Sequence, residues 1–184
     1  MKQNQVIEKE TIISSYNKFI FDLDGTLYKG DDIIPGAKEL ITELRNDGKE
    51  LLFITNKTTN SDDDYIEFLS SHEIKVSSDE LITATQITCN YLQQNFSGKN
   101  FFALAENNFI KELTKSGLRF CENPEKIELV IISLDRTLNY TKLEIAARAL
   151  EKGAYFFAAN IDDTCPVEDG EIIDAGSSIS LLEK

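Results

Sequence analysis

Two carboxylates separated by one residue stand directly after a short apolar run. Asp22 and Asp24 follow the apolar residues 19–21, which are typical of a buried strand. Alternate residues of an extended chain point to the same side, so both carboxylates can face one pocket. With no basic residue between them they repel each other unless a cation or a proton intervenes. Gly25 then permits a sharp turn, and the Thr26 hydroxyl can hold that turn in place. The segment therefore predicts a hard cation such as Mg²⁺ and an anionic substrate oxygen.

Two other interpretations of this segment have to be weighed. A calcium loop of the EF-hand type that began at Asp22 would need Gly at position 27 and Glu at position 33. Those positions hold Leu27 and Ile33, which excludes calcium binding of this kind. A plain surface turn seldom follows so apolar a strand. The functional interpretation is therefore favoured.

The elements around the pair predict where it lies. A strand over 18–22, a helix over 37–47 that ends at Gly48, and a second strand over 51–54 form a strand–helix–strand unit. Such a unit is a right-handed parallel crossover, and ligands bind at the carboxyl ends of its strands. We therefore expect Thr55, at the end of the second strand, to lie beside Asp22.

Several segments resemble one known family. The segment 21–27, Phe-Asp-Leu-Asp-Gly-Thr-Leu, resembles the first motif of the haloacid dehalogenase superfamily, which consists mostly of Mg²⁺-dependent phosphatases. The similarity continues through 34–37, 52–57, 159–166 and 175–177. This pattern is similar to the branch of p-nitrophenyl and phosphoglycolate phosphatases, in which an α/β cap is inserted after the second motif. The resemblance implies an α/β fold, with the first half of a Rossmann-like core followed by an α/β cap domain.

The resemblance also assigns roles in the core. It implies that Asp22 is the nucleophile that forms an aspartyl phosphate, and that Asp24 is the general acid and then the base. Both residues would hold Mg²⁺, Asp22 by its carboxylate and Asp24 by its backbone carbonyl. Thr55, Asn56 and Lys57 would bind the phosphate. Two alternatives remain open: Thr55 as an ordinary threonine at a strand end, and Lys57 as a solvated loop lysine.

The loop 160–166 resembles the cap segment that faces the active site and selects substrates. We expect Asn160, Asp162 and Thr164 to belong to this substrate-selecting loop. For Asp162 and Thr164, a role in capping the loop itself is an equal alternative.

The second half of the chain alternates helices and strands, so the cap should have its own sheet. Ser77 and Glu80 have the spacing of a capping box, which predicts a helix from Ser77 to about residue 96. We therefore divide the chain into a core half over 1–77 and a cap over 78–184. Further strands are expected at 100–105, 129–134 and 155–159, and helices at 107–116, 141–152 and from 177. The segment 131–138 echoes 20–27, but Ser133 stands where the first carboxylate was, so we expect Asp135 to be structural.

Two family features are not found in this sequence. The third motif supplies a lysine, usually within Gly-Lys-Pro, and the fourth supplies further acids for Mg²⁺; neither occurs in the printed sequence. We therefore expect a Mg²⁺-dependent phosphomonoesterase whose activity is impaired in this chain. The alternative is a catalytically deficient relative or fragment that acts as a binding or regulatory module.

Composition limits the partners. Of the 184 residues 41% are hydrophobic and 28% are charged, which is ordinary for a globular protein. The net charge of −13 argues against nucleic acid or an anionic membrane as a partner and leaves a small phosphorylated metabolite. Three widely spaced cysteines and no 18-residue apolar stretch favour a cytoplasmic protein. The sequence leaves open whether the protein is a homo-oligomer.

Overall fold

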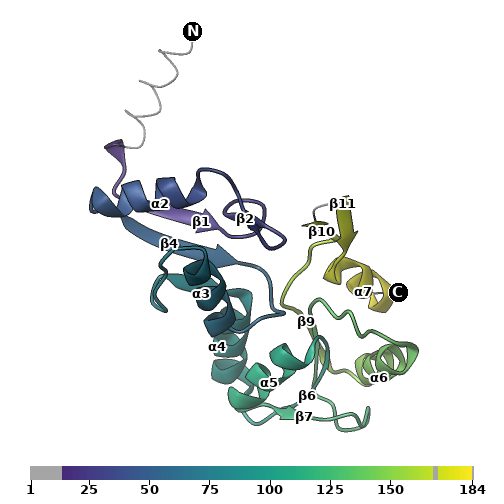
Figure 1. Ribbon diagram of the computed structural model, residues 1–184. Helices are drawn as coiled ribbons and strands as arrows, with labels where there is room; N and C mark the ends of the chain where they lie inside the picture. The colour runs from purple at the N-terminus through teal and green to yellow at the C-terminus, as the bar shows by residue number, and fades with distance from the viewer. Residues whose placement is uncertain (1–13, 168–169, 184) are drawn as a thin grey trace.

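The computed structural model describes residues 14–167 and 170–183, which form two parallel sheets with helices packed on them (Figure 1). The first sheet has the order β1-β4-β5 and is parallel throughout. Its parts are β1 (Lys18–Asp22), the hairpin strands β2 (Tyr28–Lys29) and β3 (Asp32–Ile33), α2 (Ala37–Asn46), β4 (Glu50–Thr55), α3 (Asp62–Ser71) and β5 (Leu81–Thr83). The expected strand–helix–strand unit is confirmed as β1, α2 and β4.

The second sheet belongs to the later part of the chain and has the order β7-β6-β8-β9, again parallel. Its parts are α4 (Ala84–Phe96), β6 (Asn100–Leu104), α5 (Asn107–Lys115), β7 (Arg119–Phe120), β8 (Leu129–Ile132), α6 (Tyr140–Glu151) and β9 (Tyr155–Ala158). The hairpin β10 (Thr164–Val167) and β11 (Gly170–Ile173) leads into α7 (Ala175–Leu182). This α/β architecture with two sheets confirms the expected fold class.

The core of the second sheet explains why its strands are continuous apolar runs. All four residues of β8 are buried, because helices cover both faces of the sheet. Leu129 and Ile131 pack with Leu92 and Phe109 from α4 and α5. The alternate residues of β8 pack on the opposite face with Ala146 and Ala149 of α6 and Ala175 of α7.

The expected helix start at Ser77 is wrong. Ser77 does bond to Glu80, since its amide donates to the Glu80 carboxylate at 3.0 Å, but this contact closes a turn. The chain then enters β5, whose pairing with β4 makes the first sheet three-stranded. The helix begins after Thr83, which forms a capping box with Gln86. The spacing of Ser77 and Glu80 does produce the expected bond between them, but pairing with β4, a tertiary contact, makes the following residues a strand.

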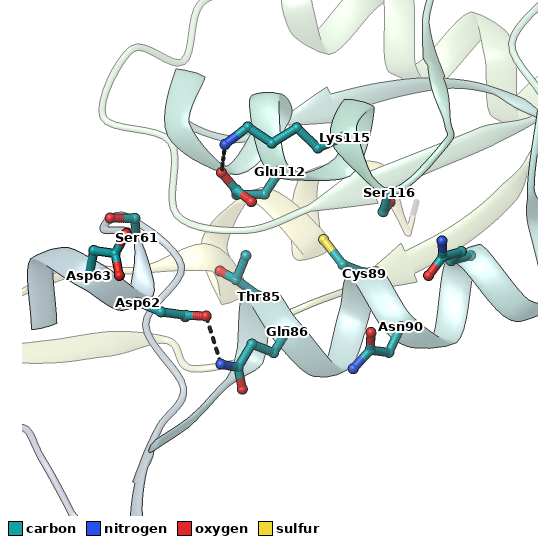
Figure 2. A pocket seen from close by; sticks show the side chains of 11 residues that line it. Ser61, Asp62, Asp63, Thr85, Gln86, Cys89, Asn90, Glu112, Lys115 and Ser116 are labelled. Atoms are coloured by element: carbon teal, nitrogen blue, oxygen red, sulfur yellow. Dashed lines mark hydrogen bonds and ion pairs between the residues drawn. The ribbon is translucent and has the colours of Figure 1, made fainter. Parts of the chain in front are cut away.

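The division of the chain near residue 77 stays a prediction, although β5 shows that the first sheet extends to Thr83. The junction is held by Asp62 of α3, which accepts hydrogen bonds from the Thr83 hydroxyl at 2.9 Å and the Gln86 amide at 2.6 Å. Figure 2 shows this junction, which borders a polar pocket between α3, α4 and α5. None of the residues predicted for the active site lines that pocket. Among the described residues no helix is long and apolar enough to cross a membrane.

Candidate active site

Parallel pairing brings the ends of β1 and β4 to one edge of the first sheet. In the register of these strands Asp22 lies opposite Ile54, so Thr55 is one residue further along the neighbouring strand. Asp22 is exposed and Thr55 is buried. The prediction that strand ends bring these two residues together is confirmed.

A tight turn after β1 directs the second carboxylate. The Leu23 carbonyl accepts hydrogen bonds from the amides of Thr26 at 3.2 Å and Leu27 at 2.9 Å. Gly25 has a φ of 74°, in the left-handed region that glycine adopts without strain. The turn therefore needs a glycine at this position, as the sequence indicated.

Asp24 is held by two side chains, one of which the sequence did not predict. The Tyr28 hydroxyl donates to Asp24 Oδ2 at 3.1 Å, and the Lys57 ammonium forms an ion pair with Asp24 Oδ1. The Asp24 side chain is 12% exposed and that of Lys57 28% exposed. Lys57 is therefore not the solvated loop lysine that was one of the alternatives. Its Nζ also lies 5.9 Å from the centre of the Tyr28 ring, within the range of a cation–π contact.

The second strand end is closed by its own turn. The Lys57 amide donates to the Thr55 hydroxyl at 3.2 Å, so this threonine shapes the loop that carries Asn56 and Lys57. The Asn56 side chain reaches the cap, where its amide donates to the Asp162 carboxylate. Of the residues predicted to bind phosphate, Asn56 and Lys57 thus already have carboxylate partners.

The cap loop lies over this edge and is fixed from beneath. Asn160 is buried and uses both ends of its side chain. The side-chain oxygen accepts a hydrogen bond from the Asp162 backbone amide at 2.9 Å, and the side-chain NH₂ donates to the Asp174 carboxylate at 3.0 Å. Asp174 also caps α7 by accepting from the Ala175 amide at 2.6 Å. The structure therefore gives Asn160 a supporting position and Asp162 the position that faces the core. Thr164 lies on the β10–β11 hairpin, where its hydroxyl donates to Glu171 at 2.8 Å.

A close contact between the start of α7 and this loop fixes the position of Asp162. The Gly176 amide donates to the Asp162 carbonyl at 2.8 Å. A Cβ on Gly176 would come within 3.0 Å of the Asp163 Cα and 3.1 Å of the Asp162 carbonyl oxygen. Only glycine permits this approach, which explains the glycine in the segment 175–177.

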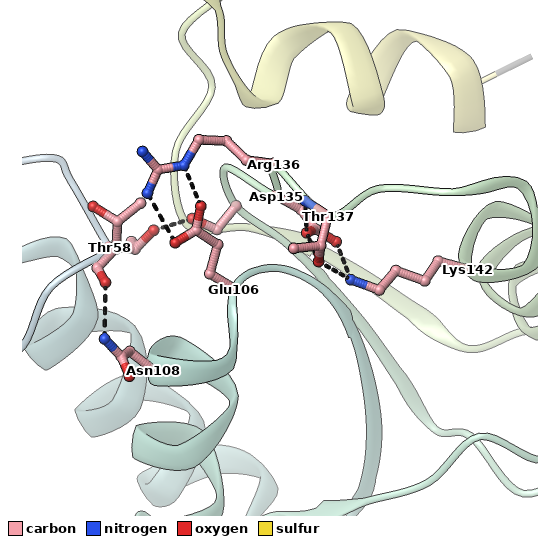
Figure 3. Close-up of polar contacts among 9 residues, drawn as sticks. Thr58, Glu106, Asn108, Asp135, Arg136, Thr137 and Lys142 are labelled. Carbon is pink, nitrogen blue, oxygen red and sulfur yellow. Dashed lines mark hydrogen bonds and ion pairs between the residues drawn. The ribbon is translucent and has the colours of Figure 1, made fainter.

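The two lobes also meet through polar side chains next to the site (Figure 3). The buried Thr58 hydroxyl bonds to the Ser133 hydroxyl, and the Asn108 amide donates to the Thr59 carbonyl at 3.2 Å. The structural role expected of Asp135 is confirmed. Its buried carboxylate accepts from the Thr137 amide at 2.9 Å and pairs with Lys142 at 2.6 Å.

The surroundings of Asp22 favour the protonated form of its carboxyl group. Although part of the Asp22 residue is open to solvent, the protein packed around its carboxylate removes some of its hydration, and this desolvation raises its pKa above the usual value. Hydrogen bonds from the Leu23 backbone and the Thr26 side chain partly offset this effect, whereas repulsion from Asp24 and Asp162 raises the pKa further. Burial, reinforced by the nearby Asp24 carboxylate, likewise raises the pKa of Tyr28, which keeps its hydroxyl a hydrogen-bond donor. The convergence of three carboxylates is the kind of field that a bound cation would relieve.

The donor set is compatible with Mg²⁺ held through few protein ligands. Asp22 is an exposed residue whose carboxylate pairs with no cation among the described residues, whereas Lys57 and Tyr28 bind the carboxylate of Asp24, so that Asp24 would offer a metal its backbone carbonyl. Mg²⁺ often keeps several waters and takes one or two carboxylates plus substrate phosphate. Within the described residues there is no cluster of three or more His, Cys, Asp or Glu side chains that could hold a metal by themselves.

The sequence missed one further residue of the site. Cys165 of β10 is partly buried, and burial raises the pKa of its thiol, while the charge of Lys57 lowers it. Asp24 and Asp162 are close enough to act on the same thiol. The lone cysteine carried no spacing signal, so only the fold could place it here.

Comparison with known proteins agrees with this architecture. The sequence model of the family described as haloacid dehalogenase-like hydrolase matches residues 19–119. An acid sugar phosphatase from Staphylococcus aureus is 32% identical over 170 residues, which cover 92% of this chain and 65% of that protein. The chain thus spans just under two thirds of the length of the curated relatives that it matches.

Solved structures show the same arrangement. A 4-nitrophenylphosphatase from Thermotoga maritima superposes with a TM-score of 0.83 at 29% identity, over 94% of this chain and 65% of that one. A p-nitrophenyl phosphatase from Archaeoglobus fulgidus gives 0.82 at 30% identity, over 90% and 63% of the two chains. A glycerol phosphate phosphatase from Mycobacterium tuberculosis, solved in complex with magnesium, gives 0.82 at 26% identity, over 94% and 52%. The chain therefore belongs to the haloacid dehalogenase-like hydrolase family.

Proposed function

We propose that the protein is a Mg²⁺-dependent phosphatase of small phosphomonoesters that works through an aspartyl phosphate on Asp22. The observation that carries the proposal is the pairing of an exposed Asp22 with an Asp24 that Lys57 and Tyr28 hold in place. The names of the relatives, acid sugar phosphatase and p-nitrophenyl phosphatase, support this reaction class. The cytosolic location expected from the sequence is part of the same proposal.

In this mechanism a carboxylate oxygen of Asp22 attacks the phosphorus, and the bond from phosphorus to the alcohol oxygen breaks. Asp24 is ionised while it pairs with Lys57, so it must first take up a proton from solvent. It then gives that proton to the departing alkoxide and later takes one from the water that hydrolyses the aspartyl phosphate. Because Tyr28 binds one oxygen of Asp24 and Lys57 the other, the two side chains fix the orientation of this carboxylate. The loop formed by Thr55, Asn56 and Lys57 would receive the phosphoryl oxygens.

Asp22 and the Asp24 carbonyl are the groups that would hold Mg²⁺, which would neutralise negative charge on the phosphate as the two anions approach. Asp162 of the cap loop is bonded to Asn56 and would contact the part of the substrate that is remote from phosphorus. A carboxylate in this place favours substrates that offer hydroxyl or ammonium groups there.

We also propose that this 184-residue chain is slow on its own. Its sequence contains no Gly-Lys-Pro segment, and preorganised charged contacts of the kind such a lysine makes contribute about 3–4 kcal/mol each to transition-state binding. Lys57 offsets part of this loss only if it releases Asp24 when phosphate binds. If Lys57 stays paired with Asp24, the chain would have no turnover. It would then act as a binding or regulatory module, which is the second candidate function.

The test is Mg²⁺-dependent release of p-nitrophenol from p-nitrophenyl phosphate, with enzyme in excess so that slow turnover is measurable. Asp22→Asn should abolish release, whereas Asp31→Asn, an exposed acid at the β2–β3 turn, should leave it unchanged. Equal rates for the unchanged chain and Asp22→Asn would reject the phosphatase. Phosphate-dependent protection against thermal unfolding would then support the binding module.

A further inference from the structure

A group of aromatic side chains is exposed where α4 lies against β9. The Phe96 ring is 5.2 Å from that of Phe157 and 5.5 Å from that of Tyr155, and the Tyr91 ring is 6.1 Å from Phe157. Tyr91 is 51% exposed and Tyr155 62%, and Ile87, one helical turn before Tyr91, is 58% exposed. We call these five residues the α4/β9 face. Its rings hold one another in place, so little conformational entropy is left to lose on binding.

The five residues of the α4/β9 face carry no charge, and the charged residues Lys99, Glu128 and Lys152 lie at its border beside Phe96 and Tyr155. Charged residues make up 28% of the sequence and the net charge is −13, so two copies repel each other over most of their surfaces. The 13 residues of α4 include no charged side chain at all. This is therefore a face by which two like-charged copies can approach.

The strand beside this face has an open edge. β9 ends the sheet order, and no strand pairs with its outer side in the part of the chain that the structure describes. The amide of Tyr155 donates to the carbonyl of Glu128, just before β8, at 2.9 Å, and that of Ala159 donates to the carbonyl of Ile132, the last residue of β8, at 2.8 Å. Because amides alternate in direction along a strand, those of Phe156 and Ala158 point to the open edge. An open edge with exposed apolar side chains is a template for pairing with another strand.

We propose that a second copy of this chain docks on the α4/β9 face, with the two β9 strands pairing antiparallel about a two-fold axis at Phe157. In this register the outward groups of Phe156 in one copy meet those of Ala158 in the other, and each pair exchanges both hydrogen bonds. The two Phe157 residues then lie directly opposite, with Cα atoms about 4.5 Å apart and their rings on the same face. The same surface serves both copies, as a closed two-fold interface requires.

The two-fold arrangement also explains the uncharged helix. A two-fold axis perpendicular to the sheet keeps both α4 helices on one face of the joined sheet and makes them neighbours across the axis. Each exposed Tyr91 is then covered by the partner helix, without a buried charge on either side. An unrelated protein could meet an aromatic face, but it would need a matching open strand of its own.

Sedimentation velocity from about 1 to 100 µM tests the proposal, and the unchanged chain should sediment as a dimer in the upper part of this range. Tyr155→Glu places a like charge at the interface, and Ala158→Pro removes an outward N–H while the bonds to β8 remain. Each should weaken the dimer at least about tenfold. Tyr140→Glu is the matched control, because Tyr140 is 84% exposed at the start of α6; it should not change association.

A monomer throughout the range, a dimer unaffected by Tyr155→Glu and Ala158→Pro, or growth beyond a dimer would each overturn the proposal. Hydrogen exchange on the unchanged chain provides a second measurement that does not depend on a variant folding. The amides of Phe156 and Ala158 should exchange more slowly as protein concentration rises, while that of Glu67, an exposed residue of α3, should not. Concentration-independent exchange at both edge amides would contradict the pairing.

Discussion

Replacing Lys57 by methionine should destabilise the protein far more than the same change at an exposed lysine. The substitution keeps most of the apolar stem but leaves the Asp24 carboxylate, which is 12% exposed, with the Tyr28 hydroxyl bond and without its cation. Hydrogen bonds to charged groups contribute about 1.5–3 kcal/mol, and the 28% exposure of Lys57 places this pair toward the lower end. We expect a loss of about 2 kcal/mol in the free energy of unfolding, or roughly 4–8 °C in the melting temperature.

Urea unfolding followed by circular dichroism measures this loss. The control is Lys115→Met, since Lys115 is 71% exposed and pairs with Glu112 within one helix, an exposed arrangement that contributes little to stability. A double-mutant cycle with Asp24→Asn isolates the ion pair, and its coupling energy should be about 1–2 kcal/mol. If Lys57→Met and Lys115→Met are equally mild, or if the cycle gives no coupling, the ion pair does not hold Asp24 and our account of the site is wrong.

Three further changes test the surroundings of the site. The pKa of Asp22 in the folded protein lies above its usual value of 3.8, so its ionisation lowers the stability of the native state as the pH rises from 3.8 through the folded-state pKa. Asp22→Asn should therefore raise the melting temperature at pH 7, and this gain should vanish below pH 3.8. Gly176→Ala should lower the stability by about 1–3 kcal/mol because the new methyl meets the backbone at Asp163; a stable variant would disprove the close contact. Hydrogen bonding to Arg45 lowers the pKa of Glu80 from 4.5 to about 2, so its contribution is present above pH 4.5 and is lost as the pH falls toward 2; Glu80→Gln should flatten the acid unfolding curve in that window.

The Gly176 prediction has a control in the same helix. Ser177 is exposed and adjacent, so Ser177→Ala should change the stability little and, if anything, favour the helix. Destabilisation by both substitutions would indicate that the start of α7 is fragile in general and not limited by its approach to the loop.

The parts of the fold that could be predicted are those that local chemistry decides. The apolar runs of β1 and β4 with a helix between them specified a parallel unit, and the glycine after Asp24 specified the turn. The region after Ser77 could not be predicted in this way. Its capping spacing was real, but the Arg45 guanidinium also holds Glu80, at 2.7 Å and 2.8 Å, and the next residues pair with β4.

The candidate site shows the same limit. The spacing of Asp22 and Asp24 identified both as site residues, whereas Lys57, the ion-pair partner of Asp24, lies 33 residues further along the chain. The sequence did contain a signal for this ion pair. Asp22 and Thr55 end two neighbouring parallel strands, and Asp24 and Lys57 each follow two residues later, so the register that brings the first pair together also brings the second pair together. Asn160 gave no such signal, because its buried bond to Asp174 depends on where α7 begins.

The bond between Asn56 and Asp162 has a consequence for how the protein is made. These residues are 106 positions apart, whereas the three strands of the first sheet that the structure describes have all been made once β5 has formed. At about 5–20 residues per second, a ribosome needs roughly 5–20 s to add the residues between them. During that interval Asp22 stands at the tip of a formed strand with nothing yet synthesised to cover it. Closing so long a loop is the entropically demanding step, so the covered site is the last part of this chain to assemble and the first that a fluctuation opens.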